Sequence, residues 1–217
     1  IMKIFYKAHM RFLMINENPL VTIYVTNFNY AAYIEDAIKS VLNQSYKSIE
    51  LIVIDDGSHD ESPRLIKELA ATHGFRFRIC KNSGLHAANN LALSLANGQF
   101  IMRLDADDWL DKNCIKVMVN ELLKDPEAVL VFPDYYLVDA MGNKLSHVRR
   151  FDFSKATLLN TPAHGACTMF RTNVLREIGG YDENYTRQDG VYIWLKIIEH
   201  YKVANINKPL FFYRQHE

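Results

Sequence analysis

Phe100-Ile-Met-Arg-Leu-Asp-Ala-Asp-Asp-Trp-Leu110 carries the clearest structural signal in the chain. Its first half is short and mostly apolar, as buried parallel strands are, and it runs directly into a cluster of aspartates. Residues 49–54 follow the same plan, because this strand-like run ends in Asp55-Asp56-Gly57-Ser58. Open parallel sheets bind ligands beyond the carboxyl ends of their strands. We therefore expect a sheet with a ligand site at these two acidic ends.

Strand and helix patterns alternate outward from these stretches. The expected strands are 20–26, 49–54, 75–80 and 100–104, and the expected helices are 33–42, 61–72, 85–96 and 112–124. This alternation is typical of βαβ units and a mostly parallel sheet. The rhythm then changes to a predicted hairpin of strands at 128–138 and 144–150, a helix at 191–201, and short strands at 203–206 and 210–213. The prediction is one α/β domain over 20–217, with flanking helices and a mixed C-terminal part, after an N-terminal extension at 1–19.

Composition excludes several classes of protein. Among the 217 residues, 25 Lys and Arg balance 25 Asp and Glu, which argues against a nucleic-acid partner. The three cysteines lie far apart without a CxxC pair, so neither a disulfide framework nor a zinc knuckle is expected. This cysteine usage fits a reducing compartment, and we expect a cytoplasmic location. No apolar run approaches the roughly 20 residues that a membrane span needs.

The first eighteen residues differ from the rest. They place Lys3, Lys7 and Arg11 among large apolar side chains. One interpretation is a basic amphipathic helix that makes a peripheral contact at the inner face of a membrane. The other is a linker or an edge element docked on the core. Both remain open at this point, as does the hypothesis that the chain is one module of a longer protein.

The aspartates after residue 104 point to a cation. At about 4 Å and an effective dielectric constant of ~20, two carboxylates repel each other by roughly 4 kcal/mol. A hard divalent cation relieves this repulsion, and carboxylate oxygens select Mg²⁺ or Mn²⁺, often together with substrate phosphates. The alternative is that Asp107, Asp108 and Asp111 start a helix, where acids are favoured. Asp55 to Ser58 is likewise open to interpretation as an ordinary turn.

Other nucleotide-binding and hydrolytic signatures are absent from the sequence. It contains no GxxxxGK[ST], no GxGxxG after the first strand, no HExxH and no GxSxG. If a phosphate group binds here, a metal ion is therefore the expected neutralising partner.

Taken in order, the motifs resemble the family 2 glycosyltransferases of GT-A fold. They are Val21-Thr-Ile-Tyr-Val-Thr-Asn-Phe-Asn29, Glu50-Leu-Ile-Val-Ile-Asp-Asp-Gly-Ser58, Asn82-Ser-Gly84, Asn97-Gly98, Leu104-Asp-Ala-Asp-Asp-Trp-Leu110, Gly179-Gly-Tyr-Asp-Glu183, Gln188-Asp189 and Tyr213-Arg-Gln-His216. Each motif is weak alone, whereas the ordered set runs from about Leu20 to His216 and is specific.

The resemblance implies a role for each matching residue. Asp189 would be the catalytic base, and Asp107 in a DXD motif would hold Mn²⁺ or Mg²⁺ on the diphosphate, with His216 approaching the metal. The remaining implied residues contact the nucleotide sugar: Thr26, Phe28, Asp56, Gly84, His86, Asp105 and Ala106. The chain departs from the family pattern in three places. Thr26-Asn27 stands where Pro-Thr or Pro-Ser is frequent before the aromatic residue, an Arg common near Asn89-Asn90 is missing, and Gln188 replaces an acid.

The implied reaction moves a sugar from a nucleoside diphosphate, UDP by family default, to a hydroxyl of a glycan or lipid-linked glycan. Attack opposite the leaving group, with Asp189 accepting the proton, would invert the anomeric carbon. Two alternatives stay open. A nucleotidyltransferase usually has a Gly-rich basic loop after its first strand, and residues 26–30 contain no Gly, Lys or Arg. The other alternative is a non-catalytic sugar- or nucleotide-binding module. Trp109 is interpreted either as a packing anchor or as a wall on the acceptor side.

Overall fold

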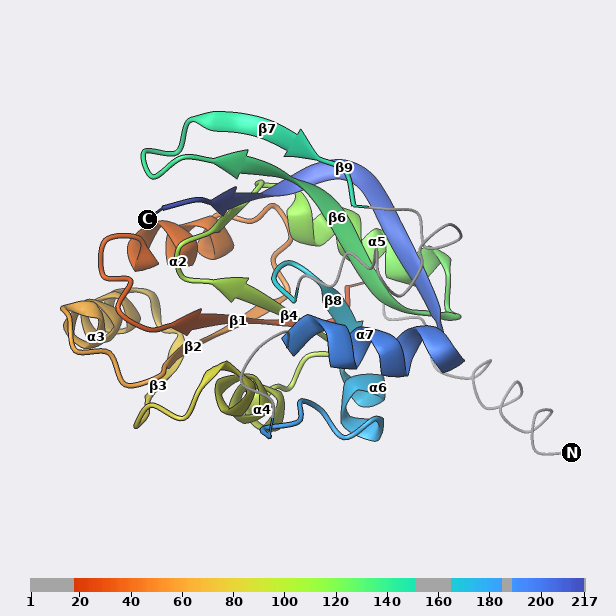
Figure 1. Ribbon diagram of the computed structural model, residues 1–217, viewed down its shortest axis with the longest axis horizontal. Coiled ribbons are helices and arrows are strands. Elements are labelled where there is room, and N and C mark those ends of the chain that lie inside the picture. Colours follow the sequence, from red (N-terminus) through yellow and green to blue (C-terminus); the bar gives the residue numbers. More distant parts are fainter. Residues whose placement is uncertain (1–17, 151–164, 185–188, 217) are drawn as a thin grey trace, which may run out of the picture.

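A computed structural model describes residues 18–150, 165–184 and 189–216 (Figure 1). The strands are β1 (Val21–Asn27), β2 (Ile49–Asp55), β3 (Arg76–Ile79), β4 (Phe100–Asp105), β5 (Trp109–Leu110), β6 (Ala128–Val138), β7 (Lys144–Val148), β8 (Met169–Arg171) and β9 (Lys202–Arg214). The helices are α2 (Ile34–Leu42), α3 (Ser62–His73), α4 (Leu85–Leu95), α5 (Cys114–Lys124), α6 (Thr172–Glu177) and α7 (Asp189–His200). No helix within these ranges has the length and apolar character needed to span a bilayer. All of the predicted contact segment 1–18 except Asn18 lies outside the described residues.

All nine strands form one sheet. Its main path runs β3-β2-β1-β4-β8-β6-β9-β5. Strand β7 lies off this path and pairs with β6. The first four strands are parallel, as the βαβ alternation predicted. Beyond them β8 is antiparallel to both of its neighbours, while β9 runs parallel to β6. The α/β class with a mixed C-terminal part is therefore confirmed.

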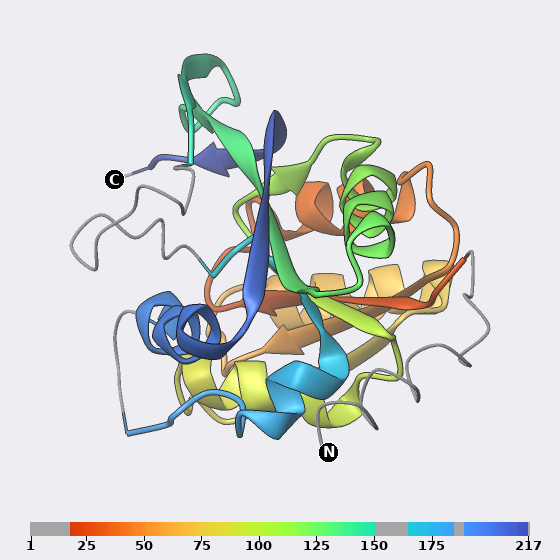
Figure 2. The ribbon, with the colours of Figure 1, turned by 90° about the vertical axis from the view of Figure 1, so that its right-hand side faces the viewer.

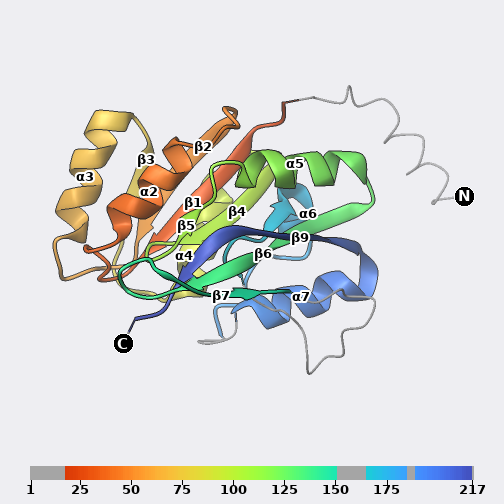
Figure 3. The same cartoon turned by 90° about the horizontal axis from the view of Figure 1, so that it is seen from above.

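Helices cover both faces of the sheet. Figures 2 and 3 show α2 and α5 on one side of the strands and α4, α6 and α7 on the other. Side chains alternate accordingly along β1, where Ile23 and Val25 enter the core beneath α2 and α5, and Tyr24 enters the core beneath α4 and α7. This period-2 alternation creates two apolar cores, one on each face.

Two sequence expectations are corrected. The strands predicted at 203–206 and 210–213 form a single strand, β9, because a register shift opposite Asp134 accommodates Asn207, Lys208 and Pro209. A proline is tolerated at such an irregularity because no ladder hydrogen bond is needed there. The helix-start alternative is wrong for Asp107 and Asp108, because Trp109 and Leu110 pair with β9 as strand β5. Asp111 does lie just before α5, where its Oδ1 accepts the Asn113 amide at 2.8 Å.

Candidate active site

The ends of β1 and β4 bring three of the predicted residues together. These strands are parallel, with Thr26 beside Asp105. The Thr26 hydroxyl donates to Asp105 Oδ1 at 2.9 Å, and the Ala106 amide donates to the Thr26 carbonyl at 3.0 Å. The Ala106 side chain is fully buried, so only its backbone contributes to the site. The register of two neighbouring strands thus fixes the start of the acidic loop.

The two acids at the end of β2 have different partners. Asp55 is fully buried and accepts hydrogen bonds from Asn27 Nδ2 at 2.7 Å and from the Ser58 hydroxyl at 2.7 Å. Asp56 instead accepts the backbone amides of Ser83 and Gly84, at 2.8 and 2.9 Å. Gly84 precedes α4 with a φ of +89°, and α4 has no side-chain cap of its own. Asp56 therefore satisfies backbone amides just before α4, although it comes from the loop after β2. Asp55 holds the loop after β2 together through its own hydrogen bonds.

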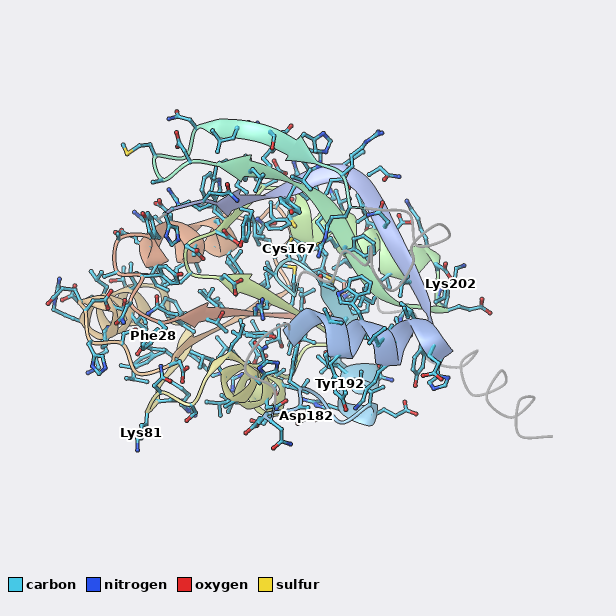
Figure 4. All side chains as sticks on the ribbon, in the orientation of Figure 1. Phe28, Lys81, Cys167, Asp182, Tyr192 and Lys202 are labelled. Atoms are coloured by element: carbon cyan, nitrogen blue, oxygen red, sulfur yellow. The ribbon has the colours of Figure 1, made fainter. Side chains whose placement is uncertain are left out.

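Phe28 and His86 lie at the margin of this arrangement. The Phe28 side chain is 42% exposed just beyond β1, open to an approaching ring (Figure 4). His86 is buried and makes an edge contact with Tyr181, with 6.4 Å between the ring centroids. Their predicted contacts with a nucleotide stay predictions.

Asp107 and His216 meet although 109 positions separate them. His216 Nε2 lies 2.9 Å from Asp107 Oδ2. The imidazole also packs against two tyrosine rings, with centroids 5.4 Å away at Tyr30 and 5.4 Å away at Tyr33. The structure thus places together the two residues that the resemblance implied for a metal.

Arg214 fixes the end of β9 on the acidic loop. Its backbone amide donates to Asp108 Oδ1 at 2.9 Å, and its Nε donates to the Asp107 carbonyl at 2.8 Å. The guanidinium carbon lies 4.5 Å from the Tyr33 ring centroid and 4.7 Å from that of Trp109. These contacts hold the chain two residues before His216, so Arg214 positions the imidazole on Asp107.

Burial and mutual repulsion shift the titration of the acidic loop. Burial, followed by the charge of Asp105, raises the pKa of Asp107 above its usual value, and hydrogen bonding from His216 partly offsets this. Burial and both neighbouring acids raise the pKa of Asp108 far above its usual value. Burial, followed by the same three acids, raises the pKa of Tyr213 to about 12. A cation bound beside these groups would oppose each of these shifts, because a nearby positive charge favours the ionised forms.

The described residues fit a divalent cation only with help from a ligand. Within residues 18–150, 165–184 and 189–216, no cluster of three or more His, Cys, Asp or Glu side chains could hold a metal ion. Arg103 Nε already pairs with Asp105 Oδ1 at 2.9 Å, which partly neutralises that carboxylate. Asp107 and His216 remain as a carboxylate and imidazole pair, a donor set that suits Mn²⁺ once phosphate oxygens complete the shell.

Four residues of this site escaped the sequence analysis. They are Tyr30, Tyr33, Arg103 and Arg214. Arg103 carried a usable signal, because it is a lone charge in an otherwise apolar central strand, two residues before Asp105 and on the same strand face. Arg214 lay inside a motif of which only the histidine received a role.

Trp109 is a packing anchor. Its ring stacks on Phe212, with a centroid distance of 4.9 Å and an interplanar angle of 6°, and the Arg214 guanidinium covers it as well. Both neighbours use ring faces that a sugar would need, so the alternative of an acceptor-side wall is not supported. The second tryptophan, Trp194 of α7, is buried against Phe132.

Asp189 is the first residue of α7. The preceding Gln188 lies outside the described residues. The role of Asp189 as a catalytic base stays a prediction.

A family model for glycosyl transferase family 2 matches residues 22–179, nearly three quarters of the chain. The chain belongs to this family. The matched segment contains the ends of β1, β2 and β4 and the aspartates that follow β2 and β4, whereas Asp189 and His216 lie beyond it. Most of the predicted site residues thus lie inside the matched segment.

Curated relatives extend the match toward the C-terminus. Chondroitin synthase of Escherichia coli is 30% identical over 192 residues, covering 88% of this chain and 28% of the relative. Hyaluronan synthase of Pasteurella multocida is 30% identical over 197 residues, covering 89% of this chain and 20% of the relative. The chain thus spans about a quarter of the length of these relatives.

Solved structures share the GT-A fold. Residues 1–349 of TarS from S. aureus in complex with UDP give a TM-score of 0.74 at 18% identity, covering 90% of this chain and 60% of that one. The mannosyltransferase PcManGT from Pyrobaculum calidifontis, in complex with GDP-Man and Mn²⁺, gives 0.70 at 23% identity, covering 98% and 64%. The predicted GT-A domain is confirmed at the level of the fold.

Proposed function

We propose that this chain transfers a sugar from a nucleoside diphosphate sugar to an acceptor hydroxyl, with inversion at the anomeric carbon. The observation that carries the proposal is the contact of Asp107 with His216, which lies beside the Thr26–Asp105 pair at the strand ends. This arrangement joins a carboxylate and imidazole pair that suits a cation to the strand ends at which α/β sheets bind nucleotides.

The relatives support the choice of substrates. Solved structures of similar fold are complexes with UDP, UDP-GlcNAc or GDP-Man, and we propose a UDP-linked donor with Mn²⁺ or Mg²⁺. Curated relatives are chondroitin and hyaluronan synthases, which favours a glycan or lipid-linked glycan acceptor in cell-surface polysaccharide synthesis. Cys80, Cys114 and Cys167 are free thiols, in keeping with the expected cytoplasmic location.

The chain's own residues divide the work of the proposed reaction. Asp56 accepts a hydrogen bond from the base, and Phe28 lies beneath the base ring. Asp107 and His216 hold the cation, which when bound stabilises negative charge on the leaving diphosphate. Asp189 accepts the proton of the acceptor hydroxyl as that oxygen attacks opposite the diphosphate.

A donor panel tests the proposal. Full-length protein with Mn²⁺ or Mg²⁺ is incubated with UDP- and GDP-sugars, and nucleotide release is measured with and without glycan acceptors. Asp107→Asn and His216→Ala should lose Mn²⁺-dependent UDP binding by calorimetry, because each removes a ligand. Asp189→Asn should retain that binding and lose transfer by about 10²–10⁴-fold.

Glu127→Gln is the matched control, because Glu127 is an exposed acid at the opposite end of the sheet, just before β6. It should leave binding and turnover unchanged. Unaltered UDP binding in Asp107→Asn would contradict the metal assignment. Pyrophosphate release from a nucleoside triphosphate and a sugar phosphate would favour the nucleotidyltransferase instead.

A further inference from the structure

A row of side chains crosses four strands on one face of the β6–β7 hairpin. Register pairs Trp109 of β5 with Phe212 of β9, Phe212 with Tyr136 of β6, and Tyr136 with His147 of β7. Successive ring centroids are 4.9, 5.5 and 5.6 Å apart. The row begins two residues after Asp107 and ends on a strand that is almost wholly exposed.

Basic residues lie along this hairpin. Val138 pairs with Lys144 and Leu137 with Ser146, so Leu145 is skipped in a bulge and Lys144 moves to the side of Tyr136. Lys144 Nζ lies 3.9 Å from the Tyr136 ring centroid. Lys144 and Arg149, the residue that follows β7, are both exposed. His147 is held differently, because its Nε2 lies 3.3 Å from Oδ2 of the buried Asp134.

The hairpin also displays apolar side chains. Met141 at its tip is 86% exposed and Leu145 at the bulge is 58% exposed, the largest values for big hydrophobic residues in the described part of the chain. The acid at the tip, Asp139, is occupied by hydrogen bonds from the Met141 and Asn143 amides. We call Tyr136, Met141, Lys144, Leu145, His147 and Arg149 the hairpin surface.

The hairpin surface is separate from the catalytic acids but is clamped to their rim. Tyr135 and Tyr213, the neighbours of the row on β6 and β9, instead pack against the core beneath α2 and α5. At the tip, Arg214 Nη1 donates to the Ala140 carbonyl at 2.6 Å, and the Gln215 amide donates to the Val138 carbonyl at 2.8 Å. Figure 1 shows β7 along the outer side of β6, away from α4.

Three occupants can be weighed for this surface. A sugar chain would need free ring faces, but Phe212 lies between Trp109 and Tyr136 in the stacked row. A second copy related by a two-fold axis would bring these cations against their own equivalents. An anionic bilayer suits every feature, because basic residues bind its headgroups, aromatic rings favour the interface and exposed apolar side chains enter it.

We propose that the hairpin surface docks the protein on an anionic membrane, with Lys144 and Arg149 on the headgroups and Met141 and Leu145 inserted between them. Docking holds the rim that carries Asp107 and His216 close to the lipid. This contact goes beyond the proposed function and uses residues other than the N-terminal segment expected to touch a membrane.

Vesicle sedimentation of the full chain tests the proposal. Vesicles of equal parts phosphatidylglycerol and phosphatidylcholine should bind the protein, and pure phosphatidylcholine should bind it much more weakly. Lys144→Gln/Arg149→Gln should weaken binding by at least about tenfold, because each basic residue near an anionic surface contributes to affinity. Lys67→Gln/Lys81→Gln is the matched control, since it neutralises two exposed basic residues near β3 at the opposite edge, and it should bind normally.

A second measurement does not depend on these variants. Brominated lipid should quench Trp109, which lies beneath the hairpin surface, and spare Trp194, which is 1% exposed; Trp109→Phe should abolish the quenching. The proposal is overturned if anionic vesicles do not bind the protein, if the hairpin variant binds as well as the wild type, or if the β3-edge control loses as much. Donor hydrolysis without vesicles tests the proposed function separately.

Discussion

Asn89 of α4 gives a sharp stability prediction. Its side chain is fully buried, and neither its amide nitrogen nor its amide oxygen has a hydrogen-bond partner in the described part of the chain. The adjacent Asn90 is the opposite case. Its amide donates to the Tyr181 carbonyl at 2.8 Å and to Glu183 Oε1 at 2.7 Å, and it accepts the Tyr181 amide at 2.9 Å. The same substitution at these two positions should therefore change stability in opposite directions.

The expected change in the free energy of unfolding follows from these hydrogen bonds. An unsatisfied buried polar group costs about 1–3 kcal/mol, and leucine at position 89 removes two such groups within a nearly unchanged branched shape. Leucine is also the better helix former by a few tenths of a kcal/mol. After a packing cost of about 1 kcal/mol, Asn89→Leu should raise the free energy of unfolding by roughly 1–5 kcal/mol. For a chain of this size that is an increase in melting temperature of roughly 2–20 °C.

Urea denaturation and calorimetry of the ligand-free protein measure both variants. Asn90→Leu should lower the free energy of unfolding by about 1–3 kcal/mol, because the Tyr181 backbone and Glu183 lose their partner. If Asn89→Leu destabilises the fold as much as Asn90→Leu does, the Asn89 amide is satisfied in solution and the reasoning is refuted.

Three further variants probe other contacts. Asp56→Asn removes the charge that accepts the Ser83 and Gly84 amides, so urea midpoints should show a loss of about 1.5–3 kcal/mol, and an unchanged midpoint would mean that α4 does not need this carboxylate. Gly98→Ala would drive a methyl group into the Thr22 nitrogen and the Phe100 carbonyl, so we expect a loss of about 3 kcal/mol or more by the same measurement, whereas a neutral result would contradict the packing there. Burial and the three acids raise the pKa of Tyr213 to about 12, so the folded state keeps its proton while the unfolded state loses it near pH ~10. This contribution is intact below pH ~10 and is lost as pH rises toward about 12, and Tyr213→Phe should delete one step near the upper end of that range in an ultraviolet tyrosine titration.

The first half of the fold was predictable because local signals and tertiary packing agree there. Strands at 49–54 and 100–104 appear as β2 and β4, extended by the acid that follows each. The prediction failed where long-range pairing decided the structure. Asn207-Lys208-Pro209 has turn chemistry, yet pairing with β6 on both sides keeps β9 continuous. Asp107 and Asp108 have helix-start chemistry, yet pairing of Trp109 with Phe212 makes a strand.

In the candidate site too, local sequence patterns predict some residues, and others depend on long-range strand pairing. The strand ends that carry Thr26, Asp56 and Asp105 could be placed from local patterns, because parallel strands end at one edge of the sheet. The aromatic and cationic supports could not be placed. Tyr33 and Arg214 take on meaning only when β9 crosses the molecule to reach the acidic loop, and no periodicity in the sequence encodes that crossing.

The length of strand β9 fixes the spacing between Asp189 and His216, the two residues at opposite ends of the proposed site. It starts at Lys202, directly after the helix that Asp189 begins, and ends at Arg214, two residues before the imidazole of His216. Figure 1 shows it passing across the width of the molecule. Because side chains alternate along a strand, adding or removing a single residue after Pro209 would turn the guanidinium of Arg214 to the opposite face and withdraw the imidazole from the acidic loop. Natural length variation in this family should therefore avoid odd steps in that stretch, even though the residues there touch no substrate.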